Sequence, residues 1–214
     1  MAKLKKEEQE ELLEKKLWKA ADKMAYLSCD LLYMRFIIIF VLLSIPGITF
    51  AQEGDTLAYN KRSILTWEDF QGSTENKNDS LRSYLSVSLQ MRRIKTNIWM
   101  GYGIYEAHAI AFKKASWVKD VPKDSSILRH QQYAFALAEL VARKLEWEVN
   151  DAKINLRWMN KINKIFANYT QFAIQCRLSY ERETQYGLNV TKQAEWEAMI
   201  DRSQIKLEIE NSRK

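Results

Sequence analysis

The sequence predicts an α+β domain in which antiparallel strands precede long helices. Six glycines and two prolines among 214 residues are few for a turn-rich all-β fold. Apolar and polar side chains alternate from Leu85 to Met91, which is typical of a half-buried strand. From Asp124 onward the apolar residues recur at helical spacing. Strands that come first and helices that follow are the order of an α+β domain.

The composition narrows the classes of function. The chain is 47% hydrophobic and 28% charged, which supports a packed core. Its net charge is +6, but basic residues alternate with acidic ones, as in Glu181-Arg182-Glu183, and form no basic patch. We therefore expect no nucleic-acid partner. Two cysteines exclude a disulfide scaffold, and two histidines, His108 and His130, exclude a three-histidine zinc site within one chain.

Residues 34–51 have the pattern of a signal peptide or membrane anchor. An apolar run from Phe36 to Ile45 follows Met34-Arg35 and precedes a helix-breaking Pro-Gly pair. Cleavage after Ala51 is expected, because the uncharged stretch 36–51 is short for a bilayer span. The chain is thus predicted to be periplasmic or secreted. The alternative is an inner-membrane anchor, with membrane contact only through 36–51.

Residues 1–33 are rich in Lys and Glu and form a charged amphipathic extension. Their apolar residues recur at spacings of four and three, which predicts a helix; they include Leu13, Leu17, Ala20 and Met24. A signal peptide starts close to its apolar core, so a true translation start at Met34 is one interpretation. In the other, this helix is the cytoplasmic part of a membrane-tethered interaction protein.

The first half of the exported part is predicted to hold the strands. Residues 52–64 are a polar lead-in, expected to be flexible, and the domain itself spans 65–210. Leu65 to Phe70 form the first packed segment. After the strand at 85–91, residues 97–112 are predicted to give two further strand segments, broken near Gly101 and Gly103.

The second half is predicted to be helical. Asp124 or Ser125 can cap the first helix, and a second helix, interrupted or not, is expected from about Asp151 to Arg182. Residues 185–189 form the next break, where Gly187 suits a positive φ. Thr191 is predicted to cap a last helix over 192–208. Cys176 falls within the helical pattern and is predicted to be a core thiol.

His130 lies on the first predicted helix, in the segment His130-Gln131-Gln132-Tyr133-Ala134. A zinc-protease helix needs His at i and i+4 to place two imidazoles on one face, and Glu at i+1 as general base. Here only the first His is present. Spacing alone therefore predicts a structural or exposed histidine.

Six blocks of sequence, in this order and at similar spacing, also occur in one known family. They are LTWEDFQG at 65–72, ASWV at 115–118, LRHQQ at 128–132, AELVARKL at 138–145, YERET at 180–184 and GLN at 187–189. Through them the chain resembles the bacterial secreted, predicted zinc-dependent protease family, a zincin-like group of otherwise unknown function. The resemblance runs from about Leu65 to Ile200 and implies a zincin-like fold.

Members of that family typically read His-Glu-Gln-Gly-His-Phe-Asp on the helix and Thr-x-His-Gly near the end. Carried over residue by residue, His130 matches the first zinc ligand, Gln131 the general base and Ala134 the second ligand. Ala136 matches the acidic position, and Tyr186 matches the later His, a third ligand. The resemblance therefore implies a degenerate member that retains only His130.

These losses predict that the zinc chemistry is gone. Gln cannot accept a proton at neutral pH, and the loss of a general base alone costs roughly 10²–10⁴ in rate. One imidazole cannot hold zinc against water and other chelators. Glu139 is nine positions from His130 and faces elsewhere on the helix. We therefore expect no functional catalytic or metal-binding residue and no cofactor, although the resembled family uses zinc.

The function predicted from these observations is that of an exported pseudoenzyme, which binds a peptide or a protein partner in the cell envelope. Aromatic residues such as Trp117 and Tyr133 could anchor a partner, although core packing is their commoner role. One alternative is an active metal-dependent peptidase with a non-standard or partner-completed site. Another is the membrane-tethered interaction protein.

Overall fold

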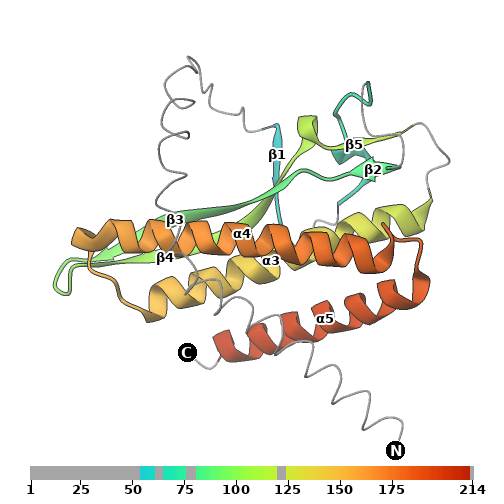
Figure 1. Ribbon diagram of the computed structural model, residues 1–214. Coiled ribbons are helices and arrows are strands. Elements are labelled where there is room, and N and C mark those ends of the chain that lie inside the picture. Colours follow the sequence, from blue (N-terminus) through green and yellow to red (C-terminus); the bar gives the residue numbers. More distant parts are fainter. Residues whose placement is uncertain (1–53, 61–64, 76–80, 120–123, 213–214) are drawn as a thin grey trace, which may run out of the picture. The chain divides into compact units, whose positions relative to one another are not determined.

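The computed structural model describes residues 54–60, 65–75, 81–119 and 124–212 (Figure 1). The chain divides into two units, Met1–Gly54 and Asp55–Lys214, and the description below concerns the second. The expected extension at 1–33 and the expected signal peptide or anchor at 34–51 lie outside the described residues. Within the expected lead-in, 54–60 are described and include a short strand.

The strands form two antiparallel sheets. The larger one has the order β1-β4-β3, with β1 at Thr56–Ala58, β3 at Val87–Asn97 and β4 at Tyr102–Phe112. The smaller one pairs β2 (Ser83–Tyr84) with β5 (Trp117–Val118). The described residues include three 3-10 turns between these elements: η2 at Trp67–Asp69, η3 at Lys113–Ala115 and η4 at Leu156–Trp158.

The prediction of two strand segments over 97–112 is wrong. The break is a single turn that closes the β3–β4 hairpin, where the Gly101 N–H donates to Asn97 O at 2.8 Å and Gly101 has φ +69°. Gly103 does not interrupt β4. Its lack of a side chain leaves room for Arg93 and Tyr105, since a Cβ there would lie 2.8 Å from both side chains.

Three long helices follow the strands, which confirms the α+β class. They are α3 at Ser125–Asp151, α4 at Met159–Thr184 and α5 at Val190–Ser212. Asp124 caps α3 as predicted, and its carboxylate accepts from Ser126 N at 2.9 Å. Within the described part of the chain, no helix combines the length and apolarity that crossing a bilayer requires.

Two helix boundaries differ from the prediction. The second helix begins at Met159 rather than near Asp151, because α3 continues to Asp151 and Asn155 then caps the turn η4. Thr191 is not the cap of the last helix. Asn189 takes that role, since its side chain accepts from Lys192 N at 3.1 Å, and Thr191 lies inside α5.

The helices cover the sheet through α3. Helix α3 lies against β4, and α4 and α5 pack on α3 (Figure 1). Side chains of β4 alternate between buried and half-buried positions, and the buried face includes Ala107, Ala109 and Ala111. These small side chains let α3 approach closely. Leu85, Ala109, Ala111 and Phe135 belong to one core cluster between the sheet and α3.

The edge of β4 that faces α3 is closed by side chains rather than by a strand. Strand β1 pairs with Ile110 to Phe112 only. Beyond it, three α3 side chains accept from β4 backbone N–H groups: Glu139 from Ala109 (2.7 Å), Glu146 from Ala107 (2.9 Å) and Asn150 from Tyr105 (2.8 Å). Buried backbone donors need such partners, so these contacts fix how α3 lies on the sheet.

Candidate functional site

His130 lies in the second turn of α3 and is 1% exposed. Its ring stacks on Tyr180 of α4, with ring centroids 4.7 Å apart and an interplanar angle of 9°. Its Nδ1 lies 3.0 Å from Gln193 Oε1 of α5, and the Tyr180 hydroxyl donates to the backbone oxygen of His130 at 3.0 Å. His130 is thus enclosed where the three long helices meet.

The hydrogen bonds around Gln193 determine which nitrogen of His130 is protonated. Gln193 Nε2 donates to the Tyr180 oxygen at 2.7 Å and to Glu197 Oε1 at 3.0 Å, so its oxygen faces His130. Nδ1 of His130 therefore donates to that oxygen, and Nε2 is the unprotonated nitrogen. His130 Nε2 is buried and has no hydrogen-bond partner among the described residues. Burial lowers the pKa of His130, which favours the neutral ring.

The residues that follow His130 are packed in the interior. Gln131 is 4% exposed and donates to Ser83 Oγ of β2 at 3.1 Å, while its Oε1 has no partner among the described residues. Ala134 and Ala136, which match a ligand and an acidic position in the resembled family, are both buried. Their methyl groups offer no atom that could bind a metal.

The turn after α4 lies directly on His130. Gln185, Tyr186 and Gly187 all have positive φ, and a Cβ at Gly187 would lie 3.1 Å from the Cβ of His130. Gly187 thus has both the positive φ expected of it and a close contact that requires glycine. Tyr186, which matches the third ligand, is 53% exposed.

These residues do not fit a zinc ion. Zinc needs three or four Cys, His or carboxylate ligands. His130 Nε2 is one imidazole nitrogen of the right kind, but Ala134 supplies none and Tyr186 supplies only a phenol. Among the described residues, no three His, Cys, Asp or Glu side chains lie close enough together to hold a metal ion.

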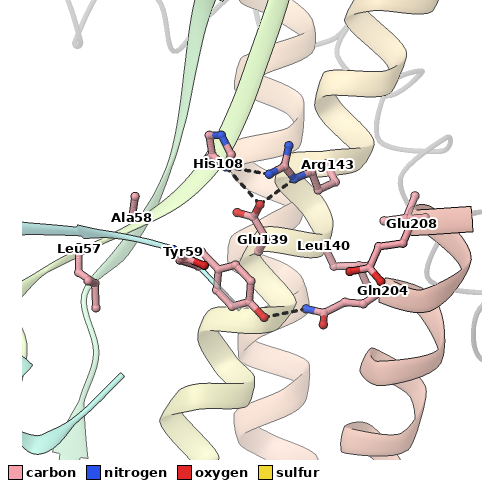
Figure 2. A pocket seen from close by; sticks show the side chains of 11 residues that line it. Leu57, Ala58, Tyr59, His108, Glu139, Leu140, Arg143, Gln204 and Glu208 are labelled. Carbon is pink, nitrogen blue, oxygen red and sulfur yellow. Dashed lines mark hydrogen bonds and ion pairs between the residues drawn. The ribbon is translucent and has the colours of Figure 1, made fainter. Parts of the chain in front are cut away.

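The structure contains a second polar cluster, formed by His108, Glu139 and Arg143, that was not predicted from the sequence. His108 Nδ1, on β4, lies 3.3 Å from Glu139 Oε1, and Arg143 Nε donates to the same oxygen at 2.8 Å (Figure 2). Arg143 Nη2 also lies 3.0 Å from His108 Nδ1. The i, i+4 spacing of Glu139 and Arg143 was the signal for their ion pair, but nothing local linked them to β4.

This second cluster forms the polar wall of a cavity of about 780 Å³. Strand β1, α3 and α5 supply most of the remaining wall, including Leu57, Tyr59, Leu140 and Gln204 (Figure 2). Gln204 Nε2 donates to the Tyr59 hydroxyl at 3.0 Å and so joins α5 to the strand side of the cavity. The volume lies in the range of small-molecule and peptide pockets.

The charged side chains of this wall form hydrogen bonds and ion pairs with other residues of the chain. Glu139 accepts from Ala109 N and from Arg143, and Arg143 Nη1 also bonds Glu146 at 3.1 Å. Burial raises the pKa of Glu139, and the Ala109 N–H and Arg143 oppose that rise. A carboxylate held in this way positions β4 against α3.

The other side chains singled out in the sequence have structural surroundings. Trp117 is 4% exposed and stacks on Tyr84, so it is a core residue and not an exposed anchor. Tyr133 is half-buried, and its hydroxyl donates to Asp201 at 3.1 Å. Cys176 is buried as predicted, and burial raises the pKa of its thiol to about 12, which makes it unreactive.

Comparison with known proteins adds no assignment: no family model, no curated protein and no solved structure matches the chain.

The neutral state of His130 predicts a pH-dependent stability. Below its ordinary pKa of 6.5 the unfolded chain binds a proton that the buried ring does not. The free energy of unfolding should therefore fall as the pH drops through that value, by up to about 1.4 kcal/mol per pH unit. In His130→Phe, which keeps an aromatic ring beside Tyr180, this contribution disappears.

Urea unfolding between about pH 5.5 and 7.5 measures the difference. His108→Gln is the control and should keep the wild-type dependence on His130. Equal slopes for the wild type and His130→Phe would show that folding leaves the pKa of His130 unchanged and would contradict the neutral, buried ring.

Proposed function

We propose that this chain is an exported, catalytically inactive relative of the secreted zincin-like proteases, which binds a peptide or a protein partner in the cell envelope. The enclosure of His130 is the observation that supports the inactive state most directly. Its one unprotonated nitrogen faces no second ligand in the described part of the chain. A hydrolase of this kind needs a metal-bound water, and this site cannot hold one.

Three further features agree with the resemblance. The strands precede the helices, His130 lies in the second turn of the long helix α3, and the 185–189 turn packs on it through Gly187. The two segments that carry the family motifs thus lie in contact at His130 and Gly187. Small or neutral side chains stand there instead, and Ala134 and Ala136 are buried in the core.

The cavity beside β1 supports the binding role. Strand β1 is an edge strand of its sheet among the described residues. Asp55 O accepts from Lys113 N, directly after β4, and Tyr59 N donates to Ala109 O of β4, so the intervening Thr56 and Ala58 direct their backbone groups away from β4. An extended peptide can add to such an edge and place a side chain in the adjacent cavity.

Restoring the lost ligands tests the inactive half of the proposal. The full chain carrying Gln131→Glu, Ala134→His and Tyr186→His should bind about one equivalent of zinc, whereas the wild type should bind less than about a tenth. Plasma mass spectrometry of the purified proteins measures the content. The matched control carries Gln132→His in place of Ala134→His. Residue 132 is two positions from His130 and faces the opposite side of the helix, so this control should bind little zinc.

Two results would count against the proposal. Near-stoichiometric zinc in the wild type, lost in His130→Ala, contradicts the inactive state. A restored variant that keeps wild-type circular dichroism but takes up no zinc contradicts the zincin-like relationship.

The proposed binding role predicts that peptides bind at the cavity beside β1 and that filling this cavity weakens their binding. Peptides chosen from a random display library on the full chain should bind Ala58→Trp at least about tenfold more weakly, because the exposed Ala58 lies at the cavity and an indole fills it. Thr74→Trp, exposed in a loop away from the cavity, is the control and should bind normally. Equal binding by both variants would place the peptide elsewhere.

A further inference from the structure

The turn of the β3–β4 hairpin exposes three large apolar side chains in succession. Ile98 is 79% exposed, Trp99 is 92% exposed and Met100 is 67% exposed. Single exposed apolar residues are common, but a contiguous group that includes a nearly bare indole marks a contact surface. The hairpin turn lies at the end of the molecule where α3 gives way to α4 (Figure 1).

A second apolar pair lies beside this turn. Trp158 is 60% exposed and Met159 is 38% exposed, and both lie where η4 meets α4. The two segments are joined through their backbones, since Leu156 N donates to Gly101 O at 2.8 Å and Tyr102 forms a bridge with Asn155. We call the group Ile98, Trp99, Met100, Trp158 and Met159 the apolar tip.

The apolar tip has a defined backbone. Asn97 Oδ1 accepts from Met100 N at 3.0 Å, and Gly101 N donates to Asn97 O at 2.8 Å. The Tyr105 hydroxyl contacts Met159 Sδ at 3.6 Å, and Asn150 bonds both backbone groups of Tyr105 at 2.8 Å. Since the turn is held by these bonds, its apolar side chains are presented without a large ordering cost on binding.

Six exposed cations lie on the segments that carry the apolar tip or directly flank it in sequence. They are Arg93, Lys95, Lys153, Arg157, Lys161 and Lys164. None of them forms an ion pair with another described residue, and Lys161 lies over the Trp158 ring at 5.2 Å. Of the nearby acids, Glu106 is paired with Arg92, Glu148 accepts from Tyr169, and Asp151 is exposed. The segments that carry the apolar tip therefore have an excess of exposed positive charge.

We infer that the apolar tip inserts into the interface of an anionic phospholipid bilayer. Tryptophan is the side chain that prefers the membrane–water boundary, and lysine and arginine beside it meet the phosphates of anionic lipids. The charge of the surrounding residues matches such a surface. This contact is independent of the proposed inactive-protease function and of any insertion by 36–51.

The cations and the apolar side chains of the tip should contribute separately to the affinity for an anionic bilayer. Each cation near an anionic surface strengthens binding about fivefold, so Lys95→Gln together with Lys161→Gln should weaken tip insertion roughly 25-fold. Trp99→Ser should weaken it about tenfold, through loss of the buried indole. Neither change touches His130 or the cavity beside β1.

A fluorescent label on the apolar tip reports whether the tip itself enters the bilayer. This local signal is needed because residues 36–51, if uncleaved, attach the full chain to any bilayer. The full chain with Cys29→Ser and Ile98→Cys takes a fluorescent NBD group at residue 98, since the buried Cys176 does not react. Vesicles contain phosphatidylcholine alone or with about one-third phosphatidylglycerol. Lipids brominated near the headgroup quench a label that lies at the interface.

We expect the residue 98 label to lose most of its emission on anionic vesicles and little on neutral ones. A label at Leu188→Cys, which is 63% exposed in the turn before α5, should lose little on either. The charge variant should need roughly 25-fold more anionic lipid for the same quenching at residue 98. A residue 98 label that stays in water on anionic vesicles overturns the inference and favours a protein partner for the tip. Equal quenching at residues 98 and 188 also overturns it, since that is adsorption without a specific site.

Discussion

The structure depends on how the backbone of β4 is satisfied where β1 ends. Strand β1 pairs with only the last part of β4, so the amides of Tyr105, Ala107 and Ala109 face α3 and not a strand. A buried amide without a partner costs about 1–3 kcal/mol. Helix α3 meets this requirement with Glu139, Glu146 and Asn150. Arg143 lies between the two carboxylates and bonds both, which offsets the cost of burying them.

This packing of α3 on β4 also occupies several side chains that could otherwise bind a ligand or take part in a reaction. Glu139 and His108, one of the chain's two histidines, are engaged in joining α3 to β4. The other histidine, His130, is enclosed by Tyr180, Gln193 and Gly187 near the N-terminus of α3. Among the described residues, no three His, Cys, Asp or Glu side chains are grouped closely enough to hold a metal ion at either site. The same part of the chain has two other open features, the cavity beside β1 and the apolar tip.

Local patterns in the sequence were enough for the fold class, the Asp124 cap and the turn at Gly187, because each depends on neighbouring residues. The prediction that Thr191 caps the last helix was wrong, because Asn189, two residues earlier, caps α5 instead. The contacts of Glu139 could not be predicted, because its partner Ala109 is 30 residues away. The pairing of His130 with Gln193 spans 63 residues and was hidden for the same reason.

Amide hydrogen exchange of β4, followed by NMR, tests the central claim most directly. We predict that the amides of Tyr105, Ala107 and Ala109 exchange as slowly as their neighbours that face β3. In Asn150→Ala, the Tyr105 amide should lose protection while Ala109 keeps it, since Glu139 still accepts from Ala109. Exchange of all three amides at the rate of the exposed turn residues Ile98 and Trp99 would contradict the claim that α3 side chains close this edge.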